Sequence, residues 1–358
     1  MKVGILGGGQ LARMLALAGL PLGLRFAFLD PLADACAFPL GDALHGMYDD
    51  HDLLYRLANE TEVVTYEFEN VSAAAVETLS KMVPVYPHLA AIAAKKDRLL
   101  EKRLFSNLGI PTPSSLPVHS LQELDDAVSQ LGFPLVLKTR SQGYDGKGQR
   151  VLKGKDDLAR AWNDLGAAPL LAEQFVPFSR ELSIMAVRGR DGETRHYPLS
   201  ENIHENGVLH LSRSRPGDPF EPLAREYVER LMAKLNYVGV LALELFQEGA
   251  TLLANEFAPR VHNTGHWTIE GAETSQFENH LRAILGFPLG DTAARGPVAM
   301  VNCIGELPDV SRILEITGAH VHAYGKAPRP GRKLGHITVC AGDEEDLSKK
   351  LADVAKIL

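Results

Sequence analysis

The stretch MKVGILGGGQLARM, residues 1–14, decides how the chain begins to fold. Apolar residues run into three glycines, and an apolar pattern of helical period starts at Leu11. The glycine spacing over residues 7–12 fits G-x-G-x-x-A, and Asp30 ends the next apolar run. The stretch therefore predicts a Rossmann-like strand–turn–helix unit. It does not identify a ligand, because a helix N-terminus of this kind accepts many anions.

Strand and helix signals alternate up to about residue 90. The pattern predicts strands over residues 2–6, 25–30, 62–68 and 83–87, and helices over residues 10–23, 49–60 and 71–82. Alternation of this kind is typical of a parallel sheet with helices on its faces.

A different pattern follows from residue 95 to residue 180. Residues 95–110 predict one connecting helix, and the Pro- and Ser-rich segment 111–118 predicts a domain boundary. The remaining signals are a helix over 120–132, a strand over 133–139, a glycine-rich loop over 141–149, and strands over 150–153 and 170–176. Together they predict a small α+β module.

Beyond residue 180 the pattern is antiparallel. A hairpin is predicted over residues 181–199, turning at Asp191-Gly192. Further predictions are a helix over 221–236, a second hairpin from strands 238–247 and 251–258, strands over 298–305, 320–324 and 335–341, and a helix over 310–316.

Composition excludes several functional classes. A net charge of −8 over 358 residues argues against a nucleic-acid-binding protein, which usually has a basic surface. Cys36, Cys303 and Cys340 lie far apart and form no C-x-x-C pair, so we expect reduced thiols in a cytoplasmic protein. The apolar stretch 14–24 is interrupted by Pro21 and by glycines, and it is too short to span a membrane.

The loop SQGYDGKGQ, residues 141–149, has two interpretations. Its glycines could bring backbone N–H groups to an anion, with Lys147 adding charge and Lys138 ending the preceding strand. It is not a Walker A loop, because Lys147 is followed by Gly148 rather than Ser or Thr. A tight surface hairpin explains the loop equally well.

Two glutamates interrupt the apolar strands of the second hairpin. Glu244 and Glu256 are separated by twelve positions, and we expect this even separation to place both on one face across a turn near Gly249. Two carboxylates on one face repel each other unless a cation lies between them, and oxygen ligands suit Mg²⁺. A metal site is therefore favoured over a solvated strand face.

Two further clusters carry cationic or donor groups. Arg260, His262 and Asn263 follow Glu256 closely and could hold an oxyanion. A later loop carries five basic side chains, stiffened by two prolines, which suits a phosphate monoester. The five are Lys326, Arg329, Arg332, Lys333 and His336. For one or two of them a solvated charged turn is the better interpretation.

Five stretches occur in an order that resembles a known family. They are YEFENV (66–71), KTRSQGYDGKGQ (138–149), EQFV (173–176), NEFAPRVHNTGH (255–266) and YGKAPRPGRKLGHIT (324–338). Together they resemble the N5-carboxyaminoimidazole ribonucleotide synthase family, ATP-grasp ligases of bacterial purine biosynthesis. The resemblance covers essentially the whole chain.

The resemblance implies a fold with α/β and α+β parts. The implied units are a Rossmann-like pre-ATP-grasp domain (1–95), an ATP-grasp lid module (96–180), a central antiparallel-sheet domain (181–295) and a C-terminal subdomain that completes the substrate site (296–358). The implied activity is that of an ATP-dependent carbon–nitrogen ligase. ATP would activate bicarbonate as carboxyphosphate, and 5-aminoimidazole ribonucleotide would take up the carboxyl group.

The resemblance also implies cofactors and partners. ATP would be a co-substrate with Mg²⁺, without NAD, flavin or biotin. The partners would be the three small-molecule substrates, with no nucleic acid and no membrane, and the enzyme would be a cytoplasmic homodimer.

Site residues follow from the same resemblance. It implies ATP contacts by Arg98, Lys138, Gly143, Tyr144, Asp145, Gly146, Lys147, Gly148, Gln149, Glu173, Gln174, Phe175, Val176, Glu181, His204, Asn255 and Glu256. It implies metal ligation by Glu244 and Glu256. It implies ribonucleotide contacts by Gln10, Leu11, Glu67, Tyr144, Asn263, Lys326, Arg332 and Lys333. It implies catalytic roles for Asp145 as a base, for Lys147 beside the substrate, and for Arg260 and His262 at the bicarbonate.

Some positions depart from wider expectations. Biotin carboxylases carry Asn where this chain has Ala258, so we expect two protein metal ligands rather than three. Cys303 is interpreted as a small apolar residue. Asp30 loses the ribose role that the opening motif suggests, since the motif then reports a fold and not a cofactor.

Three alternative functions remain open from the sequence. A sister ATP-grasp ligase, such as formate-dependent glycinamide ribonucleotide transformylase, would use the same ATP residues. An NAD-dependent oxidoreductase is supported only by residues 4–30. A non-catalytic nucleotide sensor would not need Lys138, Glu244, Glu256 and Arg260 together.

Overall fold

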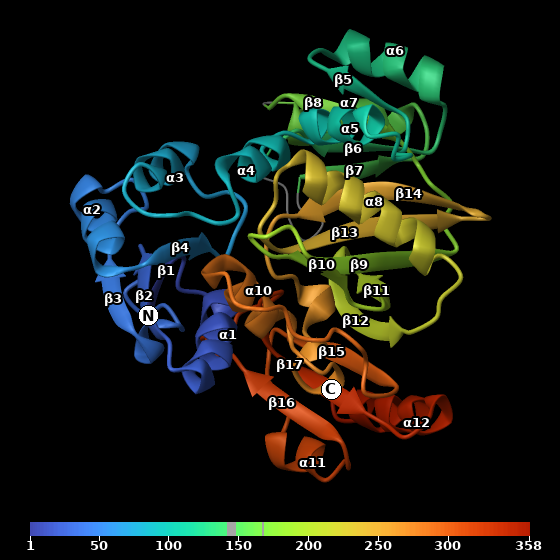
Figure 1. Cartoon of the computed structure of the whole chain (residues 1–358). Coiled ribbons are helices and arrows are strands. Elements are labelled where there is room, and N and C mark those ends of the chain that lie inside the picture. The colour runs from blue at the N-terminus through green and yellow to red at the C-terminus, as the bar shows by residue number, and fades with distance from the viewer. Residues whose placement is uncertain (142–147, 167) are drawn as a thin grey trace.

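Three β-sheets organise the chain in this computed structural model, which describes residues 1–141, 148–166 and 168–358 (Figure 1). A four-stranded sheet forms near the N-terminus, a second four-stranded sheet follows in the chain, and a nine-stranded sheet holds the rest. In Figure 1 the second sheet lies above the large sheet, and the blue N-terminal sheet lies to its left.

The N-terminal sheet is parallel, as the alternation predicted. Its order is β3-β2-β1-β4, with β1 at Lys2–Leu6, β2 at Arg25–Asp30, β3 at Asp42–His45 and β4 at Val63–Tyr66. The helices of this region are α1 (Gln10–Gly19), α2 (His51–Glu60) and α3 (Ala73–Ser80). Mostly apolar strands, buried on both faces, are typical of a parallel sheet.

Three details of this region differ from the predictions. The helix predicted over residues 10–23 ends at Gly19, because Pro21 lacks the N–H that the helical ladder needs. Strand β3 was not predicted, since its four residues are mostly exposed. The strand predicted over residues 83–87 makes only one bridge, at Val85, between two prolines that cannot donate hydrogen bonds.

The N-terminus of α1 is occupied by a carboxylate of the chain itself. Glu67, just after β4, accepts hydrogen bonds from the N–H groups of Gly9 (2.5 Å) and Ala12 (3.0 Å). Asp30 accepts the N–H of Gly8 at 2.7 Å and the hydroxyl of Tyr48 at 2.9 Å. The N–H groups of the glycine turn therefore donate hydrogen bonds to carboxylates of the chain itself. In a dinucleotide-binding fold, a pyrophosphate occupies this place.

Replacing Gly9 by alanine tests this contact. A Cβ at Gly9 would lie 2.6 Å from Oε1 of Glu67, so the carboxylate must leave the helix N-terminus. Loss of charged hydrogen bonds in a partly buried position should lower the free energy of unfolding by about 1–3 kcal/mol. Gly154→Ala is the matched control, because nothing lies within 4 Å of its added Cβ. Equal thermal unfolding midpoints for the two variants would contradict this expectation.

The second sheet forms the small module predicted before residue 180. Its order is β5-β8-β6-β7, with β5 at Ser115–Val118, β6 at Leu135–Thr139, β7 at Gln149–Leu152 and β8 at Leu170–Gln174. Helices α6 (Leu121–Leu131) and α7 (Asp156–Leu165) pack with it. The segment 111–118, predicted as a boundary, instead contributes β5, because its last four residues pair with β8.

A connecting helix is present within residues 95–110, as predicted, but it is shorter than predicted and a second helix precedes it. The structure has two helices, α4 (Leu89–Lys95) and α5 (Arg98–Asn107). Asp97 separates them in an extended conformation, where its side chain caps α5 by accepting the N–H of Leu99 at 2.8 Å. Arg140 also binds this carboxylate, so the break between the helices is fixed from the small module.

The nine-stranded sheet has the order β14-β13-β9-β11-β12-β15-β17-β16, with β10 paired to β9. Its strands are β9 (Arg180–Arg188), β10 (Thr194–His196), β11 (Leu199–Glu205), β12 (Val208–Arg215), β13 (Gly239–Glu248), β14 (Thr251–Ala258), β15 (Val298–Ile304), β16 (Ala319–Ala323) and β17 (Lys333–Cys340). Both predicted hairpins are present. Because β12 pairs with β15, the boundary predicted between residues 295 and 296 falls inside one continuous sheet.

Helices flank the large sheet and join it to the N-terminal region. They are α8 (Glu221–Lys234), α9 (Thr268–Gly271), α10 (Gln276–Leu285), α11 (Val310–Leu314) and α12 (Glu344–Ala355). The predictions omitted β11, β12, α7, α10 and α12. One apolar cluster contains Leu15 of α1 and Leu281 of α10, so the N-terminal region shares a core with the large sheet. No helix in the described residues has the length and apolarity needed to cross a bilayer.

Candidate active site

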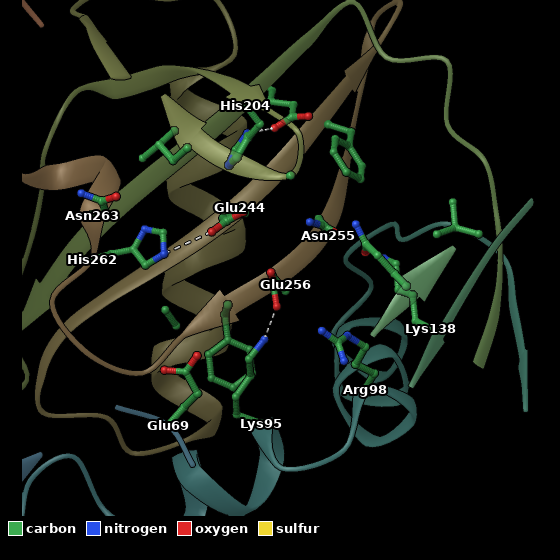
Figure 2. Close-up of a pocket in the computed structure, with 18 of the residues that line it drawn as sticks. Glu69, Lys95, Arg98, Lys138, His204, Glu244, Asn255, Glu256, His262 and Asn263 are labelled. Carbon is green, nitrogen blue, oxygen red and sulfur yellow. Dashed lines mark hydrogen bonds and ion pairs between the residues drawn. The ribbon is translucent and has the colours of Figure 1, made fainter. Parts of the chain in front are cut away.

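A cavity of about 600 Å³ collects most of the predicted site residues (Figure 2). It is lined by residues of the second and the large sheet, of the start of α1 and of the segment that follows β4. The predicted residues that line it are Gln10, Leu11, Glu67, Arg98, Lys138, Gln149, Glu173, Gln174, Phe175, Val176, Glu181, His204, Glu244, Asn255, Glu256, Arg260, His262, Asn263 and Lys333.

Gly143, Tyr144, Asp145, Gly146 and Lys147 are outside the described residues.

Among the remaining predicted residues, Lys326 reaches the edge of the cavity by binding the side chain of Gln10. Gly148 and Arg332 are not among the lining residues, and Arg332 donates to the carbonyl of Ala327 at 3.1 Å.

His336 was predicted to belong to the basic loop, and this prediction is wrong. It lies within β17, is fully buried, and contacts the hydroxyl of Tyr324 at 2.8 Å. Burial holds the pKa of His336 well below its usual value, so the ring is neutral. The strand predicted over residues 335–341 already contained His336, and in the structure the strand begins at Lys333, so the basic loop ends before His336.

Glu244 and Glu256 lie directly opposite each other on β13 and β14. The parity argument predicted this outcome for the wrong reason. The turn at Gly249 pairs Glu248 with Thr251, and that register would place Glu244 opposite Asn255. A β-bulge at Asn255 shifts the pairing by one residue, so that both Asn255 and Glu256 line the cavity with Glu244.

The surroundings of the two carboxyl groups shift their pKa values in opposite directions. Burial, together with the charge of Glu256, raises the pKa of Glu244 to about 7. Burial would also raise the pKa of Glu256, but the positive charges of Lys95, Arg98 and Lys138 together outweigh it, and the pKa falls below the usual range. Two facing carboxylates with these shifts form a site that a cation would stabilise.

His262 contacts Glu244 through Nε2 at 3.2 Å. Burial and then Arg260 lower the pKa of His262 to about 3, so the imidazole is neutral. Its Nδ1 accepts the N–H of Thr264, which leaves the proton on Nε2 facing Glu244. The ring can therefore donate one hydrogen bond into the cavity.

Arg260 is held by a residue that the sequence reasoning missed. Its Nε donates to Oε2 of Glu69 at 2.5 Å, and its Nη1 donates to the carbonyl of Val261 at 3.1 Å. Burial would raise the pKa of Glu69, but the guanidinium lowers it to about 2. Glu69 stands in the stretch YEFENV, where a second acidic residue just beyond a buried strand was the available signal.

A second buried network lies under the small module. Lys138 donates to Oε2 of Glu173 at 2.6 Å, and Lys102 lies 3.5 Å from Oε1 of the same carboxylate. Arg98 donates to the carbonyl of Thr139 at 2.7 Å. Glu173 thus fixes Lys138 with its side chain, while its backbone pairs with β5 and β6 near the end of β8 that reaches the cavity.

The far end of the cavity combines aromatic and polar residues. Phe178 and Phe246 stack with ring centroids 4.7 Å apart and line the cavity with Val176. His204 pairs with Glu181 nearby. The sequence reasoning missed both phenylalanines, because an aromatic residue in or beside a strand usually reports core packing. A flat apolar slot beside a carboxylate suits a nucleobase and its ribose.

Three family models match consecutive parts of the chain. A ribonucleotide synthetase preATP-grasp domain matches residues 1–96, an ATP-grasp domain matches residues 103–277, and a phosphoribosylaminoimidazole carboxylase C-terminal domain matches residues 298–350. These matches confirm the predicted ATP-grasp fold with its N-terminal Rossmann-like domain.

Relatives match the chain over its whole length. N5-carboxyaminoimidazole ribonucleotide synthase of Pseudomonas aeruginosa is 52% identical over 358 residues, covering 100% of this chain and 99% of the relative. The enzyme of the same name from Vibrio cholerae is 41% identical, covering 100% of this chain and 96% of the relative.

Solved structures agree with these relatives. The N5-carboxyaminoimidazole ribonucleotide synthetase of Thermus thermophilus is 51% identical with a TM-score of 0.95, covering 99% of this chain and 98% of that one. The Aspergillus clavatus synthase, solved in complex with ADP and 5-aminoimidazole ribonucleotide, is 31% identical with a TM-score of 0.92, covering 99% and 98%. The chain therefore belongs to the N5-carboxyaminoimidazole ribonucleotide synthase family of ATP-grasp ligases.

Proposed function

We propose that this chain carboxylates 5-aminoimidazole ribonucleotide with bicarbonate at the expense of ATP, for purine biosynthesis. The products are ADP, phosphate and N5-carboxyaminoimidazole ribonucleotide. The observation that carries the proposal is a single cavity that contains the facing carboxylates, the Arg260 guanidinium and the Lys333 ammonium. These three groups match the three charged partners of the reaction: a metal-bound nucleotide, a one-carbon anion and a sugar phosphate.

Glu244 and Glu256 are the proposed magnesium ligands. The donor set fits the ion, because both groups are partly buried carboxylates that face each other and repel each other there. Magnesium would neutralise charge on the transferring phosphate when it is bound. Lys138 and Arg98 add fixed positive charge on the opposite wall, and the backbone of the segment over residues 173–176, which also lines the cavity, would meet adenine.

Arg260 and His262 are the proposed bicarbonate residues. Bicarbonate is a poor electrophile, and its oxygen must first take the γ-phosphoryl group of ATP to give carboxyphosphate. Loss of phosphate then delivers carbon dioxide to the amine of the ribonucleotide. Arg260 is pre-positioned by Glu69 and needs little reorganisation to grip an oxyanion. The neutral His262 can donate a hydrogen bond without bringing a second positive charge.

The ribonucleotide is proposed to bind at the N-terminal side of the cavity. Gln10, Leu11 and Glu67 line that side, and Lys326 contacts the Gln10 side chain. Lys326, Arg332 and Lys333 would bind the 5′-phosphate. Asn263 faces the same space and is tied to Asn302 through two amide hydrogen bonds. Asp145 is the proposed base for the amine, with Tyr144 and Lys147 beside the substrate.

A direct test follows ADP release from the purified protein. Release should require bicarbonate and should rise strongly when 5-aminoimidazole ribonucleotide is added. Formate with glycinamide ribonucleotide is the matched control, since a sister ATP-grasp ligase would respond to that pair. Faster ADP release with formate than with bicarbonate would overturn the proposed function. We also propose a homodimer, which sedimentation of the protein will test.

Lys333→Ala should weaken binding of the ribonucleotide much more than binding of ATP. One lost charged contact to a phosphate is worth about 1.5–3 kcal/mol, so the KM for the ribonucleotide should rise by about 10- to 100-fold. The KM for ATP should change much less. Lys349→Ala is the control, because Lys349 is exposed on α12, where its side chain pairs with Glu345. Equal shifts in the two KM values would contradict a phosphate role for Lys333.

A further inference from the structure

Lys95 lines the cavity but has no role in the reaction as described above. It is the last residue of α4, and its side chain is only 10% exposed. Figure 2 shows its ammonium group pointing to Glu256, with Nζ 2.6 Å from Oε2. A buried lysine that touches a proposed metal ligand needs an explanation beyond surface charge.

The other partner of Lys95 is Glu101 on α5. Nζ of Lys95 lies 3.1 Å from Oε1 and 3.3 Å from Oε2 of this carboxylate, which is 1% exposed. Oε1 of Glu101 also accepts the backbone N–H of Phe257 at 2.7 Å. Glu101 therefore holds both the ammonium group and the strand residue that follows Glu256.

These contacts fix Glu256 from two directions. The backbone of β14 is pinned next to Glu256 by Glu101, and the Glu256 side chain is pinned at Oε2 by Lys95. The bulge at Asn255 interrupts the regular ladder in this part of β14, so local side-chain contacts carry more of the positioning. Hydrogen bonds to a ligating carboxylate orient it and tune the affinity of the metal.

We propose that Lys95 is a positioning residue for the divalent cation that enters with the nucleotide. By holding Oε2, it sets the orientation of Glu256 toward Glu244, and the pair of carboxylates is thereby ready for the ion. The proposal rests on the proposed function, because it takes Glu244 and Glu256 as the metal ligands. Simple electrostatics gives the opposite expectation, since removing a positive charge beside two carboxylates should strengthen cation binding.

The variants can separate positioning from folding. Lys95→Met alone would leave Glu101 buried without its cation, so the double variant Lys95→Met/Glu101→Gln is preferred. The amide oxygen of Gln at position 101 can still accept the N–H of Phe257. Glu101→Gln alone is the matched control, because it keeps Lys95 on Glu256. Lys95→Arg preserves the charge and the buried partner while changing the donor geometry.

The measurement is Mn²⁺ binding to the full-length protein with ADP, followed by the electron paramagnetic resonance of free Mn²⁺. The double variant should bind Mn²⁺ about 10- to 100-fold more weakly than the parent, the usual cost of removing such a partner. Glu101→Gln should change binding by less than about 3-fold, and Lys95→Arg should give an intermediate loss. ADP binding without metal should be the same in all variants.

Each outcome is decisive. Unchanged or tighter Mn²⁺ binding in the double variant would overturn the proposal, as would an equal loss in Glu101→Gln. If the double variant does not fold, Lys95→Arg decides, because parent-like binding there contradicts a geometric role. Glu256→Gln in the same assay tests the underlying function: retained Mn²⁺ binding there would remove the metal assignment itself, whereas its loss leaves only Lys95 in question.

Discussion

Glu256→Gln will lower kcat/KM for magnesium-ATP by at least about 100-fold, one of the two largest effects that we expect from single substitutions at the site. Glutamine keeps the size of the side chain but removes the negative charge that faces Glu244. The lost charge weakens the proposed magnesium site, and Lys95 keeps Glu101 as a partner, so the fold should survive. Steady-state ADP release at varied magnesium-ATP is the measurement.

Glu248→Gln provides the control on the same hairpin. Glu248 lies at the exposed end of β13, opposite Thr251, and does not line the cavity. Its replacement should leave the kinetics within about 2-fold of the parent, as for most surface changes. Parent-like activity in Glu256→Gln would remove the metal assignment, provided that its thermal unfolding matches that of the control.

Arg260→Lys will reduce bicarbonate-dependent ADP release by about 100- to 1,000-fold, the range seen when one oxyanion donor is lost. Lysine keeps the positive charge and can still pair with Glu69, so the buried carboxylate is not left alone. It lacks the planar fork that binds a carbonate-like anion through two N–H groups. The loss should appear in kcat and in the KM for bicarbonate, with little change in the KM for ATP.

Arg295→Lys is the matched control for the arginine exchange. Arg295 is about half exposed and pairs with Glu273 at 3.4 Å, outside the main cavity. Activity should be unchanged in this variant. A parallel rise of the KM values for ATP and bicarbonate in Arg260→Lys would place Arg260 at the nucleotide instead.

Much of the fold was predictable because its signals are local. Neighbouring residues alone are enough to recognise apolar strands that are buried on both faces, helical periodicity, and the glycine turn at residues 7–9. The break at Asp97 was not predictable in the same way. Its cap on α5 is stabilised by Arg140, more than forty residues away, and a helical pattern runs through the break.

The carboxylate pair shows how a correct prediction can hide a missed feature. Across the two-residue turn of this hairpin, residues separated by an even number of positions face each other only if one strand contains an extra residue. The bulge at Asn255 supplies that residue. The position of the bulge depends on how β14 packs against β13 and against the helices beneath it. A window of a few residues does not encode that packing.

The buried charges were the hardest part of the site to predict. Lys95, Glu101 and Lys102 sit in a stretch rich in charged residues, which usually forms a solvated helix face. Their burial follows from the small module and the large sheet closing over α4 and α5. Only contacts between distant parts of the chain reveal that Lys95 lines the cavity and that Glu101 and Lys102 lie buried behind it.

Glu67 at the first helix has a consequence for competition inside the cell. Because this carboxylate is tethered to the chain, it meets the glycine turn at an effective concentration in the millimolar range or above. A free dinucleotide would have to expel it before touching the same N–H groups. Compounds that imitate the pyrophosphate of NAD should therefore not bind at this turn. Selective inhibitors are better designed to bind the sugar-phosphate end of the cavity.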